Sequence, residues 1–311
     1  MYHRVCPRKD SWSLAPIIPE EFEKQIKYLS RNFEIIPLAG LSQLIRQRKN
    51  LPAKAVVITF DDGYRDNYIY AYLILKQYRV PATIFLTTGH ISSDKLFWWD
   101  KVGFVIHHTN ESHLNLNVLG DYSLQVQKQV LVSSQIIERL KRISEENKNR
   151  IIDKLVEDAK VNIPSGLARD LILSWDEIKE MCENGIDFGA HTVNHPILAN
   201  MPLQQAKWEI IQSKKDIEKE LGKEINIFSY PNGSFRDFNT DIMDFIKTSE
   251  FSCSVSFSSK KLISLNDNIL ALNRISGGEN FDIVKAELSG FWGDAESILT
   301  KGTVKGKTKG Y

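Results

Sequence analysis

Short runs of hydrophobic residues alternate along the chain with amphipathic helical stretches. The run 54–60 (KAVVITF) is apolar and rich in β-branched residues, which is typical of a parallel strand covered on both faces. A helical stretch near 67–78 and a second apolar run at 82–88 (ATIFLTT) follow it. A strand, a helix and a strand within about 30 residues predict a βαβ unit.

The same alternation returns after residue 170. Ser174 and Glu177 have the spacing of a capping box at the start of a helix, and Gly185 marks its end. A strand at 186–191, a helix from about 202 to 221, a strand at 225–230, a helix at 240–248 and a strand at 251–257 follow. This order predicts an α/β fold with a parallel sheet, either barrel-like or doubly wound.

Residues 97–170 interrupt the alternation. Apolar and polar residues alternate on either side of Gly120 and Asp121, which predicts a β-hairpin, and two charged amphipathic helices are expected near 134–143 and 147–160. We interpret 97–170 as an insertion into one domain formed by 1–96 and 171–295. The basic end, 296–311, is expected to be a solvated, flexible tail.

Composition narrows the classes of function. A formal net charge of +1 argues against a nucleic-acid partner or a broad contact with anionic membranes. The three cysteines lack metal-ligand spacing and are expected to be reduced. No apolar run reaches the roughly 18 residues of a membrane span, and no signal peptide is recognised, so a cytoplasmic location is expected. A leader missing upstream of Met1 stays open, as does the oligomeric state.

Two carboxylates and two imidazoles follow predicted strands. Asp61 and Asp62 come directly after the first strand, and His191 and His195 come just after IDFGA (186–190), at the end of the strand predicted there. Functional groups of parallel α/β folds gather where the strands end. One carboxylate and two neutral imidazoles can hold a catalytic divalent metal, and the second aspartate would remain free as a base. A simple turn at Asp61–Gly63 and a chance spacing of the histidines are the alternatives.

Three segments resemble motifs of a known family. TFDDG (59–63), HTVNHP (191–196) and SYPNG (229–233) are similar to the first three motifs of the polysaccharide deacetylase family, also called the NodB homology domain or carbohydrate esterase family 4. The resemblance covers most of 1–96 and 171–290. It implies a deformed (β/α) barrel of the NodB type, here with an α+β insertion. It also implies a metal-dependent hydrolase that removes N-acetyl groups from an amino-sugar glycan or glycan precursor.

The resemblance assigns roles by position. It implies that Asp62, His191 and His195 bind the metal and that Asp61 is the general base. Zinc is the expected metal, although cobalt, nickel and manganese suit the same ligands. The backbone N–H of Tyr230 is the implied second donor to the oxyanion.

Two departures from the family pattern concern the remaining roles. The usual C-terminal histidine motif is replaced by ALNRISGG, but YHRV at the start resembles the poly-N-acetylglucosamine deacetylase branch. His3 is therefore the candidate general acid, with an inert packed histidine as the alternative. The arginine that usually begins the third motif is also missing. Arg274 is the candidate to hold Asp61 ionised, unless it forms only a structural salt bridge.

Other functions stay open at this point. The same metal could serve hydrolysis of a small non-sugar amide, and a non-catalytic sugar-binding module could retain the fold. Phosphoryl transfer on the two aspartates with magnesium leaves the histidines unexplained, because magnesium prefers oxygen ligands. The aromatic stretch 97–100 (FWWD) either stacks against sugar rings or packs the insertion onto the barrel.

Overall fold

The computed structural model describes residues 1–7, 12, 16–116, 119–124, 129–257, 262–278 and 280–289. The tail predicted at 296–311 therefore lies outside the described residues. Six parallel strands form one sheet in the order β10-β9-β8-β7-β4-β3. The strands are β3 (Thr59–Phe60), β4 (Ala82–Leu86), β7 (Ile186–Ala190), β8 (Ile227–Ser229), β9 (Cys253–Ser256) and β10 (Leu272–Asn273). The predicted fold class, a deformed (β/α) barrel, is confirmed by this half-barrel sheet and the helices around it.

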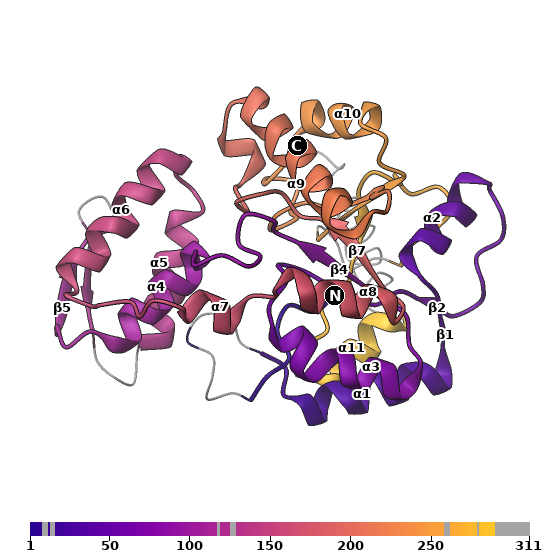
Figure 1. Ribbon diagram of the computed structural model, residues 1–311, viewed down its shortest axis with the longest axis horizontal. Coiled ribbons are helices and arrows are strands. Elements are labelled where there is room, and N and C mark those ends of the chain that lie inside the picture. The colour runs from indigo at the N-terminus through magenta and orange to yellow at the C-terminus, as the bar shows by residue number, and fades with distance from the viewer. Residues whose placement is uncertain are drawn as a thin grey trace, which may run out of the picture.

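Helices surround the sheet and bury their apolar sides against it (Figure 1). Helix α8 (Trp175–Glu183) starts with the predicted capping box, in which the Ser174 side chain accepts from the Glu177 backbone N–H and the Glu177 side chain accepts from that of Ser174. Helix α9 (Leu203–Leu221) is capped by Gly222, whose φ of 62° is easily adopted by glycine. The helices around the sheet are α1 (Pro19–Asn32), α2 (Leu38–Arg46), a π-helical turn η2 (Asn67–Tyr72), α3 (Leu73–Tyr78), α8, α9 (Leu203–Leu221), α10 (Thr240–Thr248) and α11 (Phe281–Leu288).

The first residues of the chain lie between the two edge strands of the sheet. Tyr2 pairs with Phe60 of β3 in a parallel bridge, and the Asp61 N–H donates to the Tyr2 carbonyl (3.1 Å). On the other side, the Gly277 N–H donates to the Met1 carbonyl (2.7 Å). Residues 1–2 thus connect the neighbourhoods of β3 and β10, and they bring His3 to the carboxyl end of β3.

The prediction of one continuous strand at 54–60 is wrong, because this segment forms two short strands. Its first part, β2 (Ala55–Val56), pairs with β1 (Glu34–Ile35) in a separate two-stranded sheet. Only β3 joins the main sheet, where it pairs with β4. The chain changes hydrogen-bonding partner between these parts, and no local sequence signal marks that change.

The segment between the two barrel halves has its own apolar cluster. Val102, Ile136 and Leu155 are buried there, on three different helices. In Figure 1 these helices lie to one side of the main sheet. The elements are α4 (Trp98–His108), the antiparallel strands β5 (His113–Asn115) and β6 (Asp121–Ser123), α5 (Gln129–Leu140), α6 (Glu145–Asp158) and α7 (Leu167–Leu171). Helix α4 is not among the elements expected from the sequence, and the domain boundaries stay predictions.

None of the three cysteines forms a disulfide in the described structure; Cys6 and Cys253 are buried, and Cys182 is partly buried. Within the described ranges, no helix combines the length and the apolar character that crossing a membrane requires.

Candidate metal centre

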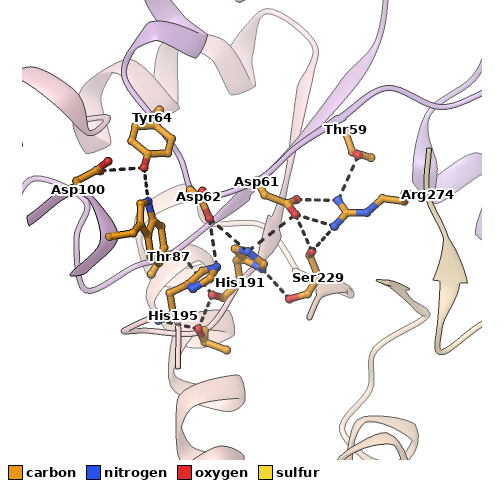
Figure 2. A network of polar contacts seen from close by, with 12 residues as sticks. Thr59, Asp61, Asp62, Tyr64, Thr87, Asp100, His191, His195, Ser229 and Arg274 are labelled. Atoms are coloured by element: carbon orange, nitrogen blue, oxygen red, sulfur yellow. Dashed lines mark hydrogen bonds and ion pairs between the residues drawn. The ribbon is translucent and has the colours of Figure 1, made fainter. Parts of the chain in front are cut away.

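Asp62, His191 and His195 converge at the carboxyl edge of the sheet (Figure 2). The Oδ1 atom of Asp62 lies 3.5 Å from Nε2 of His191 and 3.3 Å from Nε2 of His195. All three side chains are buried, and their potential ligand atoms lie within 4.8 Å of one another. Residues 129 positions apart in sequence thus meet because β3 and β7 both flank β4 in one parallel sheet.

The backbone is strained where these side chains turn inward. Asp62, Thr192 and His195 have φ values of 76°, 68° and 53°, in the left-handed region that non-glycine residues rarely adopt. Such conformations cost about 1–3 kcal/mol each and concentrate at functional sites. The Thr192 hydroxyl accepts from the His195 backbone N–H (3.1 Å), which stabilises this turn.

The donor set fits a divalent metal. Oδ1 of Asp62 is buried without a hydrogen-bond partner among the described residues, although it faces two imidazole nitrogens. One carboxylate and two imidazoles are ligands that zinc accepts in catalytic sites. Nδ1 of His191 lies 2.7 Å from the Ser229 carbonyl, so it carries the proton and leaves Nε2 free to bind a cation.

The pKa shifts of His195 and Asp62 favour the protonation states in which these side chains can bind a metal. Burial lowers the pKa of His195 to about 3, so its imidazole is neutral at physiological pH. Burial opposes ionisation of Asp62, but the neighbouring His191 and His195 outweigh it and lower the pKa of Asp62. Burial also disfavours protonated His191, whereas Asp61 and Asp62 favour it, and its pKa is raised. A cation bound between these groups would displace the proton from His191.

Asp61 forms a buried, bidentate ion pair with Arg274. Nη1 and Nη2 of Arg274 donate to Oδ1 and Oδ2 of Asp61 at 2.7 and 2.6 Å (Figure 2). Arg274 also donates to the Ser229 and Thr59 hydroxyls. Burial raises the pKa of Asp61, but the charge of Arg274 outweighs it and holds this pKa well below the ordinary value. The positively charged guanidinium of Arg274 thus lies against the Asp61 carboxylate, the neighbour that the sequence analysis suggested for it.

His3 is held close to the same carboxylates. Its charge contributes to lowering the pKa values of Asp61 and Asp62, after larger effects from burial and other partners. The His3 carbonyl accepts from the Asn67 side chain (2.9 Å). The next residue, Arg4, forms a buried ion pair with Asp66 (2.8 Å). The backbone on both sides of the His3 side chain is therefore fixed.

Tyr230 does not offer the donor that was expected of it. Its backbone N–H donates to the Val255 carbonyl (3.2 Å), as part of the contact between β8 and β9. Its ring is buried and stacks on Phe238 at 3.8 Å, and its hydroxyl donates to the Leu270 carbonyl. We therefore leave Tyr230 out of the proposed catalytic groups. The nearby Asn232 has a buried side-chain Nδ2 without a hydrogen-bond partner among the described residues.

Reasoning from the sequence missed Ser229. Its carbonyl orients His191, while its hydroxyl accepts from Arg274 and donates to Asp61 (3.3 Å). The available signal was a serine at the position where the third motif usually has arginine. The small side chain lies beside the guanidinium of Arg274, which supplies the charge from another strand end.

Sequence comparisons agree with this geometry. Residues 48–248 match the family model described as polysaccharide deacetylase. YxkH of Bacillus subtilis, whose name places it among polysaccharide deacetylases, is 24% identical over 238 residues, which are 76% of this chain and 57% of YxkH. The poly-beta-1,6-N-acetyl-D-glucosamine N-deacetylase of Staphylococcus epidermidis is 28% identical over 218 residues, 60% of this chain and 69% of that enzyme.

Solved structures show the same fold. The Streptococcus pyogenes deacetylase PplD, solved with acetate, has a TM-score of 0.60 and 20% identity, over 90% of this chain and 91% of PplD. IcaB from Ammonifex degensii has a TM-score of 0.58 and 19% identity, over 92% of this chain and 94% of IcaB. With a family match that covers more than half of its residues, the chain belongs to the polysaccharide deacetylase family.

Proposed function

We propose that this protein is a metal-dependent N-deacetylase that removes acetyl groups from an amino-sugar glycan or glycan precursor. The observation that carries the proposal is the buried group of Asp62, His191 and His195 beside an ionised Asp61. The name of the Staphylococcus epidermidis relative supports an N-acetylated sugar as substrate. A protein that only binds sugar needs neither the strained backbone at Asp62 and His195 nor a buried Asp61 held by Arg274.

The three ligands would hold a divalent cation, with zinc favoured by one carboxylate and two imidazoles. Cobalt, nickel and manganese accept the same donors, so supply also decides which is bound. When bound, the cation supplies Lewis acidity that activates water and polarises the amide carbonyl.

Asp61 would accept the proton of the attacking water. Arg274 keeps this carboxylate ionised and fixes both of its oxygens, so the acceptor has one orientation. His3 would deliver a proton to the departing amine. Its backbone is anchored through Asn67 and through the ion pair of Arg4 with Asp66, at the end of β3 where Asp61 and Asp62 lie.

Acetate release tests the proposal. The zinc-loaded protein is incubated with oligomers of β-1,6-linked N-acetylglucosamine, beside an Asp61→Asn variant of nearly the same shape. We expect release by the wild type and a loss of about 10²- to 10⁴-fold in the variant, the usual contribution of a general base. Oligomer binding without acetate release would instead indicate a sugar-binding module, and release only from small non-sugar amides would indicate the other hydrolase. The cytoplasmic location stays a prediction.

A further inference from the structure

The two histidines of the proposed metal centre are oriented in different ways. Nδ1 of His191 bonds to the Ser229 carbonyl, as is usual for a metal-binding histidine. Nδ1 of His195 is buried and has no hydrogen-bond partner among the described residues. Apart from the approach of its Nε2 to Oδ1 of Asp62 (3.3 Å), the orientation of the His195 ring must therefore come from packing.

Aromatic rings supply that packing. The indole of Trp99 lies 4.6 Å from the His195 ring, centroid to centroid, at an interplanar angle of 69°. The His191 ring lies 4.8 Å away at 75°, and the Phe97 ring 6.2 Å away at 74°. Edge-to-face contacts of this kind contribute about 0.5–1.5 kcal/mol beyond the buried area, and they depend on ring orientation.

Trp99 is itself held in one position. Its Nε1 donates to the Tyr64 hydroxyl (2.7 Å), which donates to Oδ2 of Asp100 (2.8 Å), as Figure 2 shows for the labelled Tyr64 and Asp100. The Phe97 ring stacks on the indole at 4.6 Å and 7°. Trp99 and Tyr64 are buried, at 5% and 0% exposure.

These contacts join two parts of the chain that approach the site separately. Tyr64 comes two residues after Asp62, in the loop that follows β3. Trp99 and Asp100 lie in the first turn of α4, at the start of the predicted insertion. The hydrogen bonds therefore tie helix α4 to the loop of one metal ligand, while the indole contacts another ligand.

We propose that Trp99 is a positioning residue that orients His195 for metal binding, a task that a hydrogen bond performs for His191. The inference rests on the proposed metal centre. A ligand imidazole without an acceptor at Nδ1 can rotate about its χ2 angle unless neighbours block it. Trp99, fixed by Tyr64 and Asp100, blocks that rotation. Part of the predicted insertion thus takes part in metal binding.

Metal affinity tests this role. Zinc affinity is measured by competition with a chromophoric chelator, and the visible absorption of the cobalt-substituted protein reports ligand geometry. Trp99→Leu removes the ring, Trp99→Phe keeps a smaller ring without the N–H, and Tyr64→Phe removes the hydroxyl that holds the indole. Trp98→Phe is the control within α4. The Trp98 ring touches the Trp99 indole edge-to-face (5.4 Å, 84°) and lies under Lys148 (4.8 Å), so this change alters the packing around Trp99 but keeps an aromatic ring there and leaves Trp99 itself intact.

We expect Trp99→Leu to weaken zinc binding by about 10- to 100-fold, the usual effect of removing a group that orients a ligand, and to change the cobalt spectrum. Trp99→Phe and Tyr64→Phe should lie between this variant and the wild type, and Trp98→Phe should match the wild type. Folding is judged by circular dichroism of the metal-free protein. If Trp99→Leu fails to fold, the zinc affinities and cobalt spectra of Trp99→Phe and Tyr64→Phe test the inference instead.

Wild-type affinity and an unchanged cobalt spectrum in the folded Trp99 variants would overturn the inference while leaving the proposed function intact. An equal loss of affinity in Trp98→Phe would also overturn it, because the effect would then reflect general packing of α4. A wild-type protein that binds no divalent metal would overturn both the inference and the proposed metal centre.

Discussion

Replacing Arg274 by methionine should strongly destabilise the protein, and the effect should depend on pH. Asp61 and Arg274 are 3% and 8% exposed, and their two hydrogen bonds are 2.7 and 2.6 Å long. Removing one partner of a buried ion pair costs about 3–5 kcal/mol, because the other charge stays buried without compensation. Methionine has a similar length and no charge, so the substitution tests the charge more than the packing.

The sign of the pH dependence follows from the pKa of Asp61. In the wild type this pKa is lowered on folding, so the ion pair stabilises the fold above the ordinary aspartate pKa of about 3.9, and this contribution is lost as the pH falls through the lower folded value. In the variant, burial is opposed only by the smaller effects of His191 and His3, so we expect the folded pKa of Asp61 to be raised. Stability of the variant then decreases as the pH rises above about 3.9. The difference in the free energy of unfolding between the wild type and Arg274→Met should be widest near neutral pH.

Urea unfolding of the metal-free proteins at pH 7.5 and pH 4 measures this gap. Arg65→Met is the matched control, since Arg65 pairs with Glu177 at 2.7 Å but its side chain is 38% exposed. The pair is only partly buried, since the Glu177 side chain is 11% exposed, and ion pairs that reach solvent contribute about 1 kcal/mol or less. A loss in Arg274→Met no larger than in the control, or a gap that stays the same at both pH values, would refute this account of Asp61.

Three further variants test other parts of the site and fold. His3→Gln should lower kcat/KM by about 10²- to 10⁴-fold, the usual contribution of a general acid, while zinc content measured by atomic emission stays unchanged; loss of zinc would show that His3 acts on the metal instead. Asn232→Ala should lower kcat by about 10²-fold with little change in KM if its buried, unpaired Nδ2 donates to the oxyanion, and unchanged steady-state kinetics would exclude that role. Ser174→Ala should lower the free energy of unfolding by about 1 kcal/mol without changing acetate release, because it removes the N-cap of α8; an unchanged unfolding midpoint in urea would contradict the capping account.

Local signals allowed much of the fold to be predicted from the sequence. The capping box of Ser174 and Glu177 lies within a single turn, and its structure follows from a few adjacent residues. The edge of the sheet that carries the candidate metal ligands also followed from local order, because parallel strands end on the same side of a sheet. The residues Asp62, His191 and His195 meet there.

Contacts between distant segments were harder to predict. The split of 54–60 into β2 and β3 depends on which strands lie alongside, and the engagement of the Tyr230 N–H depends on β9. Trp99 approaches His195 only because α4 packs beside the ligand loop, and no spacing in the sequence encodes that contact. The pair of Arg274 and Asp61 spans 213 residues, and only the missing motif arginine pointed to it.

A zinc titration of the metal-free protein, with acetate release from an N-acetylglucosamine oligosaccharide recorded at each addition, tests the central claim most directly. We predict that release rises in proportion to added zinc up to one equivalent per chain and then stays constant, and that His191→Ala releases none over the same range. Full release in the presence of excess chelator, or no release from the wild type with one equivalent bound, would contradict the assignment of Asp62, His191 and His195 as the metal centre of a deacetylase.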